Sequence, residues 1–113
     1  MSIASDMIRG HTDTIILALL NSGDSYGYKI NKRICDLTSG QYELKEATLY
    51  TAFKRLEESG CISSYWGNEE SGARRRYYTI TTRGKKVYGE LLNEWENTKS
   101  IIDRLVSRVE DMT

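Results

Sequence analysis

The sequence predicts a mainly α-helical protein with one small β-hairpin and a long C-terminal helix. Three observations support this fold class. Apolar residues recur at helical spacing in three segments before residue 60. Two strand-like segments flank a glycine-containing loop between residues 61 and 80. The chain contains no proline, so nothing interrupts a long final helix.

Length and composition set the first limits on function. The chain has 113 residues, which suits one domain, and its 16 basic and 16 acidic side chains give a formal net charge of zero. No apolar run is long enough to span a membrane and no leader-like segment is present, so we expect a cytoplasmic protein. Cys35 and Cys61 are expected to be reduced thiols. His11 is the only histidine and no phosphate-binding loop occurs, so we expect no enzyme, metal site or cofactor.

Residues 5–21 are expected to form the first helix, with apolar character on two faces. Its buried stripe would contain Ile8, Thr12, Ile15, Ile16, Leu19 and Leu20. A weaker stripe contains Met7, His11, Thr14 and Ala18. Two such faces indicate either a partner subunit or ligand on the second face, or one thick core around the helix.

The next two helices are joined by a short connection. Asp24 or Ser25 would N-cap the second helix, which runs to about Thr38. Ile30, Ile34 and Leu37 would form its buried stripe, and Tyr42 to Leu44 would form a very short strand. The third helix runs from about Glu46 to Ser59, and Gly60 would end it. Its buried stripe contains Leu49, Ala52, Phe53 and Leu56.

The opposite face of the third helix carries small, hydroxyl and basic residues: Ala47, Tyr50, Thr51, Lys54, Arg55 and Glu58. Such a face suits a DNA major groove, although an ordinary solvated face has the same composition. The hairpin follows, with strands at 61–66 and 75–80 and a polar loop at 67–73. Arg74, Arg75 and Arg76 would contact a phosphate backbone or minor groove, or would form a plain solvated charge run.

From Thr81 or Thr82 a long helix is expected to continue almost to the C-terminus. Its heptad seam contains Tyr88, Leu91, Trp95, Thr98, Ile102, Leu105, Val109 and Met112. A helix of about 40–45 Å is too long for so small a domain to cover. We therefore expect the seam to pack against the same helix of a second copy; the alternative is packing on the first helix alone.

Three helices, a basic hairpin and a long helix follow one another in the order of a winged helix-turn-helix. In that arrangement the third helix enters the major groove and the hairpin, or wing, follows the backbone. Residues 1–81 would form the DNA-binding domain, and residues 82–113 the dimerisation helix that packs with the first helix.

Three segments resemble the PadR family of transcriptional regulators. TLYTAFKRLEESG, from Thr48 to Gly60, is similar to the family's recognition helix. RRRYYTITT, from Arg74 to Thr82 and followed by Gly84, is similar to its wing, and Tyr26-Gly27-Tyr28 to the start of its second helix. The residues assigned to DNA contact are Ser25, Tyr26, Tyr28, Lys29, Lys45, Thr48, Tyr50, Thr51, Lys54, Arg55, Arg74, Arg75 and Arg76.

Within the compact subgroup of that family, residues 60–81 and Trp95 resemble a lactococcal multidrug-resistance regulator most closely. The resemblance implies that planar aromatic drugs stack between two symmetry-related copies of Trp95. It also implies that the pore is lined by Met7, His11, Thr14, Ala18, Leu91, Leu92 and Lys99. Lys99 replaces an acid of the drug-binding relative, and its charge would disfavour cationic drugs. Trp95 as a plain dimer-core aromatic is the alternative.

Charge is segregated along the chain despite its zero sum. Residues 69–86 contain six basic and two acidic side chains, whereas residues 87–113 contain three and six. The positive segment is the expected wing with its exit into the long helix, and the negative one is the expected dimerisation helix, a pattern that favours DNA in one orientation. We therefore expect a homodimeric DNA-binding repressor released by an aromatic molecule. The alternative is a ligand-independent winged-helix dimer that binds protein.

Overall fold

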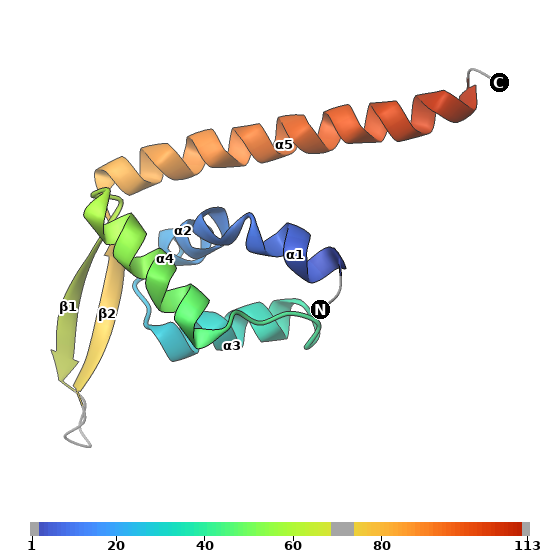
Figure 1. Cartoon of the computed structure of the whole chain (residues 1–113). Helices are drawn as coiled ribbons and strands as arrows, with labels where there is room; N and C mark the ends of the chain where they lie inside the picture. The colour runs from blue at the N-terminus through green and yellow to red at the C-terminus, as the bar shows by residue number, and fades with distance from the viewer. Residues whose placement is uncertain (1–2, 69–73, 112–113) are drawn as a thin grey trace.

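The computed structural model describes residues 3–68 and 74–111, with side chains for 5–67 and 74–107. It contains the expected helices and hairpin, so the predicted fold class is confirmed (Figure 1). The elements are α1 (Ile3–Arg9), α2 (Thr12–Asn21), α3 (Gly27–Leu37), α4 (Glu46–Glu58), β1 (Ile62–Asn68), β2 (Arg74–Ile80) and α5 (Thr82–Asp111). None of the described helices has the length and apolar character needed to cross a membrane.

The single first helix predicted for residues 5–21 is wrong, because the chain breaks between α1 and α2. Gly10 and His11 form a turn in which the amide of His11 donates to the carbonyl of Ile8 at 2.8 Å. The hydroxyl of Thr12 then donates to the carbonyl of Arg9 at 2.6 Å. Glycine is a poor helix former, which allows the break at this point. Each stripe of the predicted helix is therefore divided between α1 and α2.

The core gathers around α2, whose Ile16 and Leu17 are completely buried. The whole predicted stripe of α4 is buried with them, as are Ile30 and Ile34 of α3. Leu37 was predicted to be buried as well, but it is 69% exposed. It continues the stripe of α3 in register, yet the core ends one turn earlier at Ile34.

The start of α3 differs from the prediction that Asp24 or Ser25 caps it. Tyr26 occupies the N-cap position, and no cap hydrogen bond from its side chain occurs among the described residues. Ser25 instead exchanges two backbone hydrogen bonds with Tyr78 of β2, at 2.7 and 3.2 Å. This isolated bridge fixes the wing to the start of α3 without adding a third strand to the sheet.

The short strand predicted at Tyr42 to Leu44 is also wrong. The side-chain amide of Asn31 binds both backbone groups of Leu44, accepting from its N–H and donating to its carbonyl, each at 2.8 Å. This side chain therefore takes the place of a partner strand. The contact holds the loop before α4 against α3.

The hairpin is antiparallel, with Ile62 opposite Ile80 and Asn68 opposite Arg74. Gly67 was predicted to lie in the loop, but β1 extends through it to Asn68. At the other end, Gly60 has the expected positive φ of 78° after α4. A Cβ on Gly84 would lie 2.0 Å from the carbonyl oxygen of Cys61, so glycine is required where α5 meets the hairpin.

Helix α5 has 30 residues and is about 45 Å long at 1.5 Å per residue. Val87, Tyr88 and Leu91 pack on the core, and α2 is the helix that α5 contacts most. Beyond Leu92 the described side chains are exposed, and α5 projects past the helical body (Figure 1). One half of the helix thus packs within the chain, as the alternative interpretation required, while the other half stays open.

Buried Tyr78 predicts how stability responds to alkaline pH. Its ring stacks on Phe53 with centroids 3.9 Å apart, and burial raises the pKa of its hydroxyl. The unfolded chain releases this proton near pH 10, whereas the folded chain keeps it to higher pH. The contribution of Tyr78 to stability should therefore be complete below about pH 10, and above it this contribution should fall by at most about 1.4 kcal/mol per pH unit.

Urea denaturation between pH 8 and 11.5 measures this decline. Tyr78→Phe removes the titrating group, so its stability should fall less steeply above pH 10. Tyr28→Phe, at an exposed position, is the matched control and should keep the wild-type profile. A Tyr78→Phe profile as steep as the wild type would show that other groups cause the decline.

Candidate nucleic-acid interface and apolar pocket

Side-chain contacts tie the hairpin to both helices of the helix-turn-helix. On one face of the sheet, Arg76 donates to Glu57 of α4 at 3.2 Å and to Ser64 of β1 at 3.0 Å. On the other face, Arg75 lies 4.6 Å from the ring centroid of Tyr26 and donates to its hydroxyl at 3.2 Å. The start of α3, the helix α4 and the wing therefore keep a fixed arrangement.

The exposed face of α4 agrees with the helical periodicity. Thr51 and Lys54 are exposed, and Tyr50 is partly so. The hydroxyl of Tyr50 lies against Gly27, where an added Cβ would be only 2.6 Å away. Tyr50 and Tyr28 thus line one groove of about 560 Å³ between α3 and α4. The close contact explains why the second residue of the Tyr-Gly-Tyr segment is glycine.

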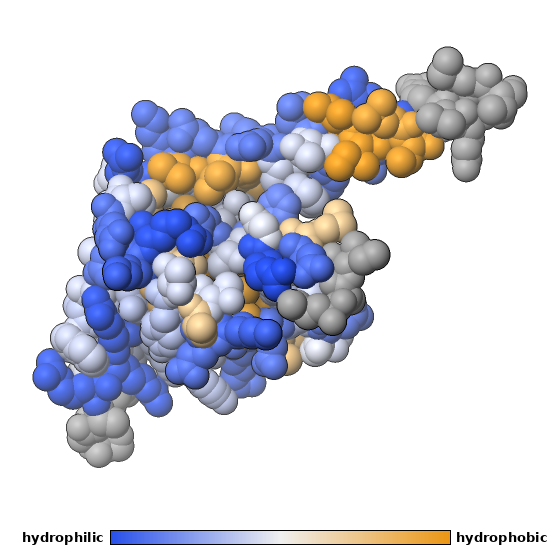
Figure 2. Space-filling model, in the orientation of Figure 1, coloured by the Kyte–Doolittle hydropathy of each residue, from blue (hydrophilic) through white to orange (hydrophobic). Residues whose placement is uncertain are grey.

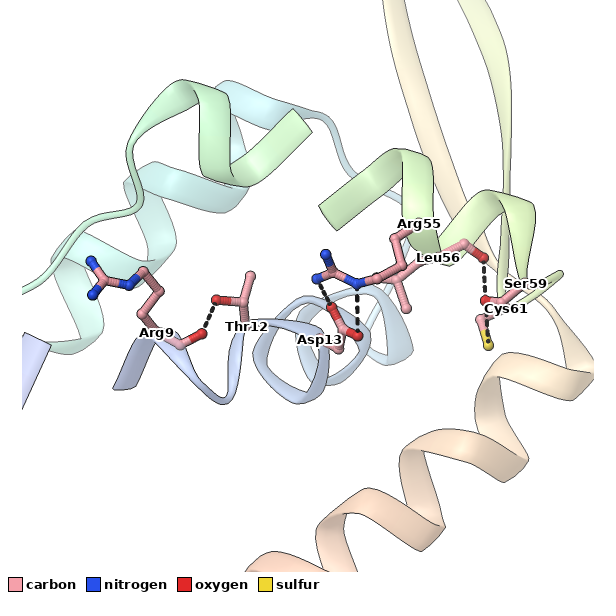
Figure 3. Close-up of polar contacts among 7 residues, drawn as sticks. All are labelled: Arg9, Thr12, Asp13, Arg55, Leu56, Ser59 and Cys61. Atoms are coloured by element: carbon pink, nitrogen blue, oxygen red, sulfur yellow. Dashed lines mark hydrogen bonds and ion pairs between the residues drawn. The ribbon is translucent and has the colours of Figure 1, made fainter. Parts of the chain in front are cut away.

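Arg55 has a partner that the sequence pattern did not reveal. Its Nε donates to Oδ2 of Asp13 at 3.3 Å, and its Nη2 donates to Oδ1 of the same carboxylate (Figure 3). The bidentate pair joins α4 to α2, and the hydrogen bond to Asp13 raises the pKa of Arg55. Arg55 therefore has a structural contact as well as an exposed edge. No local sequence signal connects two residues 42 positions apart.

Most of the other residues assigned to DNA contact are accessible, but Ser25 is not. Its side chain is 5% exposed, and its hydroxyl has no hydrogen-bond partner among the described residues. Tyr26 and Thr48 are half-buried. The exposed members of the set are Tyr28, Lys29, Lys45, Tyr50, Thr51, Lys54, Arg55, Arg74, Arg75 and Arg76. A direct phosphate contact from the Ser25 hydroxyl is therefore inconsistent with its burial.

Aromatic side chains brace the arginines of the wing. Tyr77 stacks on Tyr65 with centroids 5.5 Å apart and meets Tyr26 edge to face at 5.3 Å. Tyr65 donates to Asp24 at 2.7 Å, and this hydrogen bond raises the pKa of Tyr65. The guanidinium of Arg74 lies 5.1 Å from the ring centroid of Trp66. Alternation along the strands was the only sequence signal for these contacts.

Gly67 makes this aromatic packing possible, because a Cβ there would lie 2.4 Å from Cε2 of Tyr77. Gly67→Ala should displace the ring and destabilise the protein by about 1–2 kcal/mol. Thermal denaturation measures the change. Gly89→Ala is the matched control in α5, where the new Cβ would point into open space. It should stabilise by about 0.5–1 kcal/mol, and equal effects at both positions would contradict the account.

An apolar pocket of about 390 Å³ lies where α1 and α2 meet α5. Its lining consists of Met7, Ile8, His11, Thr14, Ile15 and Trp95. The ring of His11 contacts that of Trp95 with centroids 4.9 Å apart. Met7, His11 and Thr14 of the second stripe therefore share one pocket with Trp95. Trp95 is 38% exposed, so one side of the pocket is open.

The remaining residues assigned to ligand contact lie around this pocket rather than in it. Ala18 of α2 and Leu91 and Leu92 of α5 are half-buried and are not among the lining residues. Lys99 lies 5.8 Å from the ring centroid of Trp95 and forms an ion pair with Glu96 at 3.1 Å. Glu96 thus offsets part of the positive charge that Lys99 brings to the pocket.

The residues assigned to the dimer interface divide into two groups. Tyr88 and Leu91 pack on the core of their own chain. Trp95, Thr98, Ile102 and Leu105 are exposed, and Leu105 is 64% exposed. The side chain of Val109, and all of Met112, lie outside the described residues. The space-filling view shows an apolar patch on the projecting part of α5 (Figure 2). The exposed apolar side chains of this part of the helix are Ile101, Ile102, Leu105 and Val106.

Comparisons with known proteins agree with this architecture. The sequence model of the Transcriptional regulator PadR-like family matches residues 16–90. A solved transcriptional regulator from Clostridium thermocellum is 54% identical, with a TM-score of 0.83, over 93% of this chain and 99% of that one. A PadR family regulator from Clostridium difficile is 36% identical, with a TM-score of 0.75, over 85% and 98%. An uncharacterized protein from Lysinibacillus sphaericus is 44% identical over 96% of this chain and 99% of its own.

Proposed function

The chain belongs to the PadR-like family of transcriptional regulators, and from this premise we propose that it is a homodimeric repressor released by an aromatic molecule. Family membership implies DNA binding and confirms the prediction that the protein is not an enzyme. The repressor role, the dimer, the contact residues and the ligand are the proposed part. They rest on the interface, the pocket and the open half of α5.

For DNA, we propose that α4 enters the major groove and the wing follows the backbone. The main support is that side-chain contacts between the wing and the helices hold three exposed basic groups in one arrangement. Lys54 lies on the outer face of α4, while Arg74 and Arg75 lie on the wing that Glu57 and Tyr26 hold against the helices. In a dimer the two copies of α4 would reach successive major grooves about 34 Å apart.

For the dimer, we propose that the exposed seam of α5 packs against a second copy. Residues 1–81 would then bind DNA while residues 82–113 join the protomers. The support is an apolar stripe through Ile102 and Leu105 on a helix that its own chain leaves open. Acidic residues outnumber basic ones beyond residue 86, so this end of the molecule would lie away from DNA.

For the ligand, we propose that a planar aromatic molecule occupies the pocket between His11 and Trp95. The pocket is apolar and opens beside the seam, so a second Trp95 would close it from the partner side. The resemblance of this chain to a multidrug-resistance regulator, stated from the sequence, is part of this proposal. Lys99 favours neutral or anionic compounds over cationic ones, although Glu96 reduces this preference.

Binding to the DNA upstream of the protein's own gene, with and without a panel of aromatic dyes and phenolic acids, tests the proposal. We expect a specific complex that some of these compounds weaken. Tryptophan fluorescence reports ligand binding, because Trp95 is in the pocket and Trp66 is on the wing. Quenching that persists in Trp95→Ala would remove Trp95 from the site. Absence of specific DNA binding would favour the winged-helix protein-interaction module instead.

A further inference from the structure

One turn of helix contacts both the apolar pocket and the recognition helix α4. That turn is the start of α2, which contains Asp13. His11 and Thr14 line the pocket on one side of it. The carboxylate of Asp13 holds Arg55 of α4 on another side (Figure 3). A displacement of this turn would therefore change the contacts of both the pocket and α4.

The break between α1 and α2 lets the turn move without carrying the whole first helix. Gly10 and His11 lie outside both helices, and the hydrogen bond from the Thr12 side chain to the carbonyl of Arg9 spans the break. The ring of His11 contacts Trp95 two residues before Asp13. A molecule inserted between His11 and Trp95 would have to displace His11, and the adjacent turn would move with it.

We propose that Asp13 is a positioning residue that transmits occupancy of the apolar pocket to the recognition helix through Arg55. The inference rests on the proposed function and names its regulation. A bidentate carboxylate–guanidinium pair requires a narrow geometry, so a displaced Asp13 pulls on Arg55 or releases it. Either change alters the arrangement of α4 relative to the wing, and thereby the fit to DNA.

The size of the effect follows from the exposure of the pair. Both side chains are partly exposed, 53% for Arg55 and 35% for Asp13, so solvent screens their interaction. A pair of this kind carries at most about a fivefold effect on an equilibrium. The remaining guanidinium edge of Arg55 is free to contact DNA without breaking either hydrogen bond to Asp13.

The test compares operator affinity with and without a saturating aromatic probe in the full-length protein. The probe is pyrene-1-sulfonate, which is planar, aromatic and anionic and so suits an apolar pocket beside Lys99. Operator binding is followed by fluorescence anisotropy, and probe binding by its own emission. Asp13→Asn keeps the shape of the side chain, and Arg55→Lys keeps the charge but loses the bidentate geometry. The quantity of interest is the ratio of the two operator affinities, because it cancels any direct contact of Arg55 with DNA.

We expect both variants to bind the probe as the wild type does, while the ratio moves toward one by up to about fivefold. Asp6→Asn is the matched control, since it removes the carboxylate from a similar exposed ion pair, with Arg9 within α1. Its ratio should equal that of the wild type. If Asp13→Asn shows the wild-type ratio of operator affinities with and without the probe, the proposed role of Asp13 is wrong. That result would leave the proposed function intact. A wild-type protein that fails to bind the operator, or to respond to the probe, would overturn the proposed function and this inference with it.

Discussion

Leu105→Glu should convert the protein to a monomer and lower its operator affinity by at least about 100-fold. Leu105 is largely exposed on the open half of α5 and continues the seam of Trp95, Thr98 and Ile102. A glutamate there would place an unpaired charge within the proposed interface. Two linked half-site contacts bind about 10²–10⁴-fold more tightly than one, and the monomer loses this gain.

Sedimentation velocity and operator titration measure the two effects in the same samples. Because Leu105 lies outside the core of its own chain, the far-ultraviolet circular dichroism of the variant should be unchanged. Ser100→Glu adds the same charge on the side of α5 opposite the seam and should remain dimeric. A dimeric Leu105→Glu variant with wild-type affinity would contradict the assignment of the seam.

Lys54→Glu should reduce operator affinity about 100-fold without changing stability. Lys54 is exposed on the face of α4 opposite Ala52, Phe53 and Leu56, so it makes no contribution to the core. The reversal removes an attraction to phosphate and adds a repulsion in each protomer. If each protomer loses about tenfold, the dimer loses the square of that factor.

Fluorescence anisotropy with a labelled operator gives the affinity, and thermal denaturation gives the stability. Lys86→Glu makes the same charge change on the outer face of α5, near the hairpin exit, and should weaken binding far less. An equal loss in both variants would mean that net charge alone governs binding. In that case α4 would have no special place at the interface.

Helical periodicity correctly predicted α4, because its four apolar residues form one narrow buried stripe. The same reasoning failed at Leu37, since periodicity gives the direction of a side chain but not where the core ends. It also missed the break at Gly10. A 3.6-residue pattern continues through a single turn when residues on both sides still contact the same neighbours.

The sequence predicted the exposed basic residues of the candidate site, but it did not predict the contacts that hold them in place. Exposure of Lys54 follows from the position of the buried stripe alone. The pair of Asp13 with Arg55, and the bridge from Ser25 to Tyr78, are long-range contacts that depend on how the helices and the hairpin pack. Local patterns contain no information about such distances. Ser25 was therefore predicted to be a cap and a phosphate contact, whereas in the fold its backbone pairs with Tyr78 of β2.

The salt dependence of operator binding tests most directly whether a dimer binds DNA through the basic groups of α3, α4 and the wing. Lys29, Lys54, Arg74 and Arg75 of two protomers provide eight cations. If all contact phosphates, the logarithm of the binding constant should fall linearly with the logarithm of salt concentration, with a slope of about −7. A slope near zero between about 50 and 200 mM salt would contradict the account.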